Sequence, residues 1–163
     1  MEATGASDPA VKNAIDKWES RVSNIVDVRI GEAQRDFDPP ALQALVEQAI
    51  LAKTHADFTF VNRGGIRDHL LKGPIVARAI WNILPFDDRI LVASVPGKLL
   101  SEALRGGRAV EPEHLYTVAL PDFVVENQRE RMRLGVEGIK FRNTGEVLRD
   151  LMIDWVKSKR ILD

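Results

Sequence analysis

The sequence predicts an α+β domain in which helices pack on a mixed β-sheet. Helical and strand-like segments alternate along the 163 residues, but several strand-like segments follow one another too closely for a regular series of parallel β-α-β units. The 23 Lys and Arg residues nearly balance the 24 Asp and Glu residues, which argues against a nucleic acid polymer as a partner. No apolar run is long enough to span a membrane, so we expect no membrane span either.

Apolar residues at helical spacing, with start signals before them, predict the helices. Ser7-Asp8-Pro9 starts a helix with a stripe of Val11, Ile15, Trp18 and Val22. Asp38-Pro39-Pro40 starts a second one at Ala41, and shorter helices are predicted over residues 77–84 and from Gly97. A last helix, capped by Asn143-Thr144, carries apolar residues between Val147 and Val156. We expect residues 1–7 to be disordered or a linker, and residues 8–163 to form one domain.

Strands are predicted over residues 25–30, 57–62, 89–95 and 115–125. The segment 89–95 is a nearly continuous apolar run, which is typical of a strand buried on both faces. Pro121 interrupts the segment 115–125. These four segments are the strands of the predicted mixed sheet.

The segment from Asp57 to Arg67 has the pattern of an anion site. A strand ends at Asn62, the chain turns through Gly64 and Gly65, and Arg67 follows. Glycines at a strand end permit a positive φ and let a ligand approach the backbone closely, and an arginine fork suits phosphate or carboxylate. The alternative is a simple turn beside a surface arginine, since a Gly-Gly pair is by itself a weak signal.

Two phenylalanines occupy similar positions further along the chain. Phe86 follows Pro85 between a helix and a strand, and Phe123 follows Pro121 at a bend. Each ring could lie exposed at a cavity and stack on a planar ligand, or each could fill the core. Phe86 precedes two aspartates, and we expect its ring to be accessible at a cleft.

Taken together, four ordered motifs resemble the C-terminal domain of the 5'-nucleotidase family, which includes UDP-sugar hydrolases and 2',3'-cyclic nucleotide phosphodiesterases. They are the turn from Asn62 to Arg67, the Gly73-Pro74-Ile75 step, the Pro85-Phe86 pair and the strand that ends in Gly97-Lys98-Leu99-Leu100. The resemblance implies a substrate-binding domain for a nucleotide or related phosphate ester, in a hydrolase of nucleotide catabolism. It also implies a periplasmic or extracellular location.

The resemblance assigns roles to single residues. It implies that Arg35, Asn62 and Arg67 contact the substrate, with both arginines directed at phosphate, and that Phe86 and Phe123 enclose the nucleobase. Gly64 and Gly65 belong to the same substrate-binding turn.

Two departures from the family pattern concern this site. Arg63 replaces the first glycine of the family's Gly-Gly-Gly-Ile-Arg turn. The family's Gly-Gly-Asp-Gly loop, which helps to hold the ribose, is absent after Phe123, where Glu126 or Asn127 could supply replacement contacts. The alternative function is therefore a non-catalytic binding or scaffold module that keeps the fold but has lost nucleotide binding.

The chain is predicted to be catalytically inactive by itself. In the family, two divalent metal ions in an N-terminal metallophosphatase domain of the same polypeptide activate water, and this sequence has none of that domain's motifs. The three histidines, His55, His69 and His114, are scattered, and cysteine is absent. We therefore expect no metal, other cofactor or catalytic residue in this chain, and we expect the N-terminal domain to be its partner.

Overall fold

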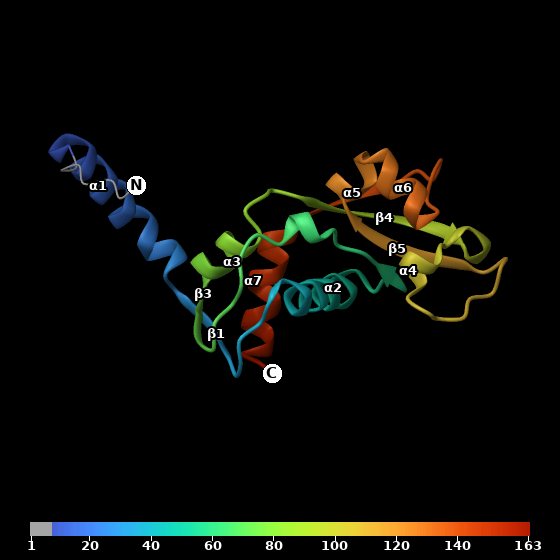
Figure 1. Cartoon of the computed structure of the whole chain (residues 1–163), viewed down its shortest axis with the longest axis horizontal. Helices are drawn as coiled ribbons and strands as arrows, with labels where there is room; N and C mark the ends of the chain where they lie inside the picture. The colour runs from blue at the N-terminus through green and yellow to red at the C-terminus, as the bar shows by residue number, and fades with distance from the viewer. Residues whose placement is uncertain (1–7) are drawn as a thin grey trace, which may run out of the picture.

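The structure, a computed structural model, describes residues 8–163. Its fold is α+β, with helices packed on two small sheets (Figure 1). The helices are α1 (Pro9–Val26), α2 (Pro39–Thr54), α3 (Ala77–Ile83), α4 (Glu102–Arg105), α5 (Asp122–Glu126), α6 (Gln128–Leu134) and α7 (Leu148–Lys159), with short 3-10 turns η1 (Arg63–Gly65) and η2 (Gly97–Leu99). The strands are β1 (Arg29–Ala33), β2 (Phe58–Thr59), β3 (Gly73–Val76), β4 (Arg89–Pro96), β5 (Leu115–Pro121), β6 (Arg142–Val147) and β7 (Ile161–Leu162).

The larger sheet has the strand order β2-β5-β4-β6. Strand β5 runs parallel to β2 and antiparallel to β4, so the sheet is mixed as predicted. The smaller sheet has the order β3-β1-β7, with β1 antiparallel to β3 and parallel to β7. The single mixed sheet of the sequence prediction is therefore two sheets in the structure.

Strand β5 separates two hydrophobic clusters because its side chains alternate between its faces. Ala119 belongs to the cluster around α2, α3 and α7. Its neighbours Val118 and Leu120 belong to the cluster with α5 and α6, and all three side chains are fully buried. In strand β4, Ile90 and Val95 divide in the same way. The residues between them are partly buried or exposed, so the burial on both faces that was predicted for this segment holds only at its two ends.

Helix α1 extends away from the rest of the fold (Figure 1). Asp8 caps its start, as the sequence predicts, by accepting a hydrogen bond from the backbone of Ala10. Its predicted stripe is largely exposed, with Trp18 at 63%. Two ion pairs from Arg78 on α3, to Glu19 and Asp27, hold its C-terminal half.

Three sequence predictions about local structure were wrong. Residues 25 and 26 belong to α1, so the first strand begins only at Arg29. After Pro121 the chain forms helix α5 rather than continuing the strand. Asn143 and Thr144 lie in strand β6, and the last helix begins at Leu148, because pairing with β4 overrides the local capping signal.

Residues 1–7, for which we expect a disordered or linker segment, lie outside the described residues. Within residues 8–163, no helix is both long and apolar enough to cross a bilayer.

Candidate functional site

A cavity of about 310 Å³ lies at one end of the larger sheet, within the size range of small-molecule sites. Its lining comprises Asn62, Gly64, Gly65, Arg67, Phe86, Asp88 and Phe123. Six of the seven site residues predicted from the sequence are therefore neighbours in space, although they come from three separate stretches of the chain.

The strand pairing explains why these stretches meet. Strands β2 and β5 are parallel, with Thr59 opposite Ala119, so the chain leaves both strands at the same end of the sheet. Strand β4 is antiparallel to β5, with Ile90 opposite Pro121, so β4 begins at that end. Consequently the turn after β2, the segment before β4 and the start of α5 surround one space.

The backbone holds Arg67 in place at the end of the η1 turn. Its amide donates to the carbonyl of Ile83 at the end of α3, at 2.9 Å. Its side chain is exposed, and Nη1 lies 3.4 Å from the carbonyl oxygen of Gly64, which makes this a weak hydrogen bond. The guanidinium forms no ion pair among residues 8–163, so its charge is available to an anion.

Gly64 and Gly65 do not form a left-handed turn. Neither has a positive φ, so the first of the two reasons that the sequence suggested for them was wrong, and the close approach of a ligand to their backbone stays a prediction. A Cβ on Gly64 would lie 3.3 Å from Nδ2 of Asn62, and one on Gly65 would lie 3.4 Å from Oδ1 of the same side chain. The two glycines therefore leave room for the half-buried amide of Asn62 at the cavity wall.

Phe86 and Phe123 line the cavity with exposed rings. Phe86 is 47% exposed and Phe123 is 50% exposed, so the accessibility predicted for Phe86 is confirmed. The segment that carries Phe86 is anchored by its neighbour Asp87, whose carboxylate pairs with Arg149 of α7 at 2.5 Å. Arg149 is itself buried, and its guanidinium carbon lies 3.6 Å from the centroid of the Trp81 ring.

Asp88 is a cavity residue that the sequence reasoning missed. It is half-buried at the start of β4, and its carboxylate has no hydrogen-bond or ion-pair partner within residues 8–163. Burial, together with the nearby carboxylates of Asp122, Asp87 and Glu126, raises the pKa of Asp88 above its ordinary value. The sequence signal that could have identified Asp88 as a cavity residue is its position two residues after Phe86, just before an apolar strand.

We expect Asp88→Asn to stabilise the chain at pH 7 but not at pH 3. A raised folded-state pKa means that the folded chain holds this proton more tightly than the unfolded chain, so stability falls as the pH rises from about 4 through the raised pKa. Asparagine removes this loss. Thermal unfolding at both pH values tests this expectation, with Glu137→Gln at an exposed position as a control for the loss of a surface charge. An equal increase in Tm at pH 3 and pH 7 would contradict the raised pKa of Asp88 as the cause.

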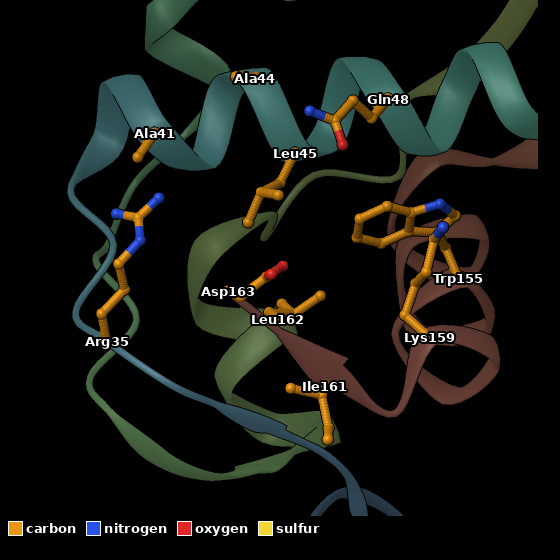
Figure 2. A pocket seen from close by; sticks show the side chains of 10 residues that line it. All are labelled: Arg35, Ala41, Ala44, Leu45, Gln48, Trp155, Lys159, Ile161, Leu162 and Asp163. Atoms are coloured by element: carbon orange, nitrogen blue, oxygen red, sulfur yellow. The ribbon is translucent and has the colours of Figure 1, made fainter.

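Arg35, the remaining predicted site residue, lines a different cavity of about 340 Å³ (Figure 2). Its guanidinium lies 4.2 Å from the centroid of the Phe37 ring, at the side of the cavity formed by the start of α2. Trp155 and Lys159 of α7 form the opposite side. The phosphate contact that the resemblance implies for Arg35 stays a prediction.

The two departures from the family motifs have structural consequences. Arg63 is exposed and faces an adjoining cavity that it shares with Asn62 and Arg133. Neither Glu126 nor Asn127 lines the cavity of Arg67, and the side chain of Asn127 accepts a hydrogen bond from the backbone of Glu130 at the start of α6. The replacement ribose contacts suggested for these two residues therefore have no support in this geometry.

No three His, Asp or Glu side chains gather closely enough to hold a metal ion in the part of the chain that the structure describes. The donor set of the cavity, with a single carboxylate and one amide, does not suit a divalent metal. The catalytic metals implied by the resemblance have no fitting site among residues 8–163.

Comparison with known sequences identifies a family and several relatives. A family model described as the 5'-nucleotidase C-terminal domain matches residues 20–109, more than half of the chain. The endonuclease YhcR of Bacillus subtilis is 31% identical over 105 residues, a match that covers 60% of this chain and 8% of YhcR. The trifunctional nucleotide phosphoesterase protein YfkN of the same species is 26% identical over 113 residues, which cover 61% of this chain and 8% of YfkN. The chain thus spans less than a tenth of these two relatives.

Solved structures show the same fold. The 5'-nucleotidase precursor of Thermus thermophilus superimposes with a TM-score of 0.78 at 19% identity, covering 98% of this chain and 42% of its own. The NAD nucleotidase of Haemophilus influenzae gives a TM-score of 0.72 at 12% identity, covering 97% of this chain and 40% of its own. At these identities the likeness establishes the architecture and leaves function open.

Proposed function

Since the chain belongs to the family of 5'-nucleotidase C-terminal domains, we propose that it is the nucleotide-recognition domain of a metallophosphoesterase. The observation that carries this proposal is the single cavity in which Arg67 faces the same space as two half-exposed phenylalanine rings. A cation beside an aromatic pair suits a ligand with an anionic end and a planar end. A nucleoside monophosphate is such a ligand.

The proposed division of roles follows from the chemistry of the lining. Arg67 binds the phosphate, Phe86 and Phe123 stack on the base, and Asn62 offers both a donor and an acceptor from the cavity wall. A separate metallophosphatase domain of the same polypeptide would hold the metals and supply the hydrolytic chemistry. The domain described here recognises and orients the substrate.

The alternative, a scaffold module without nucleotide binding, has the absent Gly-Gly-Asp-Gly loop in its favour. Against it stands the cavity itself. Two phenylalanines at about 50% exposure and an arginine that forms no ion pair with residues 8–163 contribute little to the stability of the fold, yet they line the same cavity.

We expect the double substitution Phe86→Ala with Phe123→Ala to weaken binding of a nucleoside monophosphate and of its nucleoside about equally. Stacking of a base on an aromatic side chain contributes about 1–3 kcal/mol, so removing both rings should reduce affinity at least tenfold. Isothermal titration calorimetry on the purified chain measures both ligands. Trp18→Ala, which removes an exposed aromatic ring from α1, is the matched control.

Unchanged affinity in the double variant would reject the aromatic pair as the base site. Loss of binding in Trp18→Ala to the same degree would indicate that the effect does not come from this cavity.

A further inference from the structure

The cavity of Arg67 is lined by side chains of opposite charge. Among residues 8–163, Arg67 is the only cation in its lining, and Asp88 is the only anion. Three further carboxylates, those of Asp87, Asp122 and Glu126, lie close enough to Asp88 to act on it electrostatically. The phosphate of a bound nucleotide is attracted by Arg67 and repelled by Asp88.

The sheet register brings Asp88 close to Phe123. Asp88 lies two residues after Phe86 and two residues before Ile90, which is opposite Pro121. Phe123 lies two residues after Pro121, and Asp88 lines the same cavity as both rings. A base stacked on these rings therefore lies near the carboxylate of Asp88.

The free carboxylate restricts which base fits. An ionised carboxylate only accepts hydrogen bonds, and it has two oxygens side by side. A base that covers it must donate, because a half-buried polar group that loses water without a partner is unfavourable. Adenine and cytosine place an acceptor next to their amino groups, whereas guanine places the N1–H donor next to its N2 amino group.

We propose that Asp88 determines base specificity and selects guanine, with its two carboxylate oxygens accepting from N1–H and from the N2 amino group. This inference rests on the proposed nucleotide function and adds the substrate class, guanine nucleotides. The raised pKa of Asp88 agrees with a carboxylate that lacks a partner in the unliganded chain.

Calorimetric titration of the chain with GMP and IMP tests the inference, since IMP differs from GMP only by lacking the N2 amino group. We expect GMP to bind about tenfold more tightly than IMP, as one hydrogen bond to a charged group is lost. In Asp88→Asn the preference should fall to about twofold or less. The matched control is Glu126→Gln, which removes a nearby carboxylate outside the cavity lining and should keep the preference.

Three outcomes would overturn the inference. Equal affinity for GMP and IMP in the unmodified chain would show that the amino group is not read. A GMP preference that survives Asp88→Asn would assign the recognition to another residue. Loss of affinity for 2',3'-dideoxy GMP that disappears in Asp88→Asn would assign Asp88 to the ribose.

The same titrations separate this inference from the proposed function. Binding of GMP, IMP, AMP and UMP with similar affinities, weakened in each case by Phe86→Ala, retains the nucleotide site and rejects only the role of Asp88. Absence of binding for all four nucleotides rejects the proposed function itself.

Discussion

Replacing Arg67 with alanine should lower the affinity for a nucleoside monophosphate about tenfold or more and leave the affinity for the unphosphorylated nucleoside unchanged. A charge-assisted contact from arginine to phosphate contributes about 1.5–3 kcal/mol, and 1.4 kcal/mol is a factor of ten. The side chain is exposed and forms only a weak bond to the carbonyl of Gly64, so the fold should survive the substitution. Calorimetry with both ligands, together with thermal unfolding, measures the two parts of this expectation.

A matched control for Arg67→Ala is Arg129→Ala, which removes the same charge from an exposed position on α6 outside the cavity. Its affinity for the nucleotide should stay within about twofold of the unmodified chain. If Arg67→Ala weakens the binding of both ligands equally, or unfolds the chain, then Arg67 has a structural role and the proposed phosphate site is rejected.

Gly135→Ala should destabilise the fold severely. Gly135 ends α6 with φ of +75°, and an added Cβ would lie 1.8 Å from the carbonyl oxygen of Leu99 and 3.1 Å from the amide nitrogen of Ser101. The left-handed conformation and the forced separation of two backbones together amount to about 3–5 kcal/mol. A loss of this size corresponds to a fall in Tm of roughly 10 °C or more for a domain of this length.

Gly138→Ala separates the two causes of this loss. Gly138 has nearly the same φ, +76°, but an added Cβ would meet no atom within 4 Å. Its destabilisation should be limited to the conformational strain, about 1–2 kcal/mol. Equal losses in the two variants would show that the close approach of Gly135 to Leu99 contributes nothing.

Helix-capping signals in the sequence were reliable where neighbouring residues alone determine the local structure. The cap at Asp8, followed by proline, correctly predicted the start of α1, and the similar signal at Asp38 predicted α2, which begins two residues before the expected Ala41. Asn143-Thr144 carries a similar signal, but Asn143 lies opposite Leu91 in a strand pair between distant segments. Pairing of this kind is not visible in local spacing, so the last helix was predicted to begin too early.

The same distinction applies to the site. Order and spacing of the motifs were enough to select six residues that the structure brings to one cavity. Asp88 was missed because its position depends on the register of β4 against β5, which the sequence does not reveal. Arg35 was grouped with the others by resemblance, and the structure places it in a separate cavity beside α7.

The most direct test of the nucleotide site is a crystal structure of the chain with bound GMP. The proposal predicts the base between the rings of Phe86 and Phe123, with phosphate oxygens within hydrogen-bond distance of the Arg67 guanidinium. Nucleotide bound in the cavity beside Arg35, or no nucleotide in either cavity at a concentration that saturates the chain in solution, would contradict it.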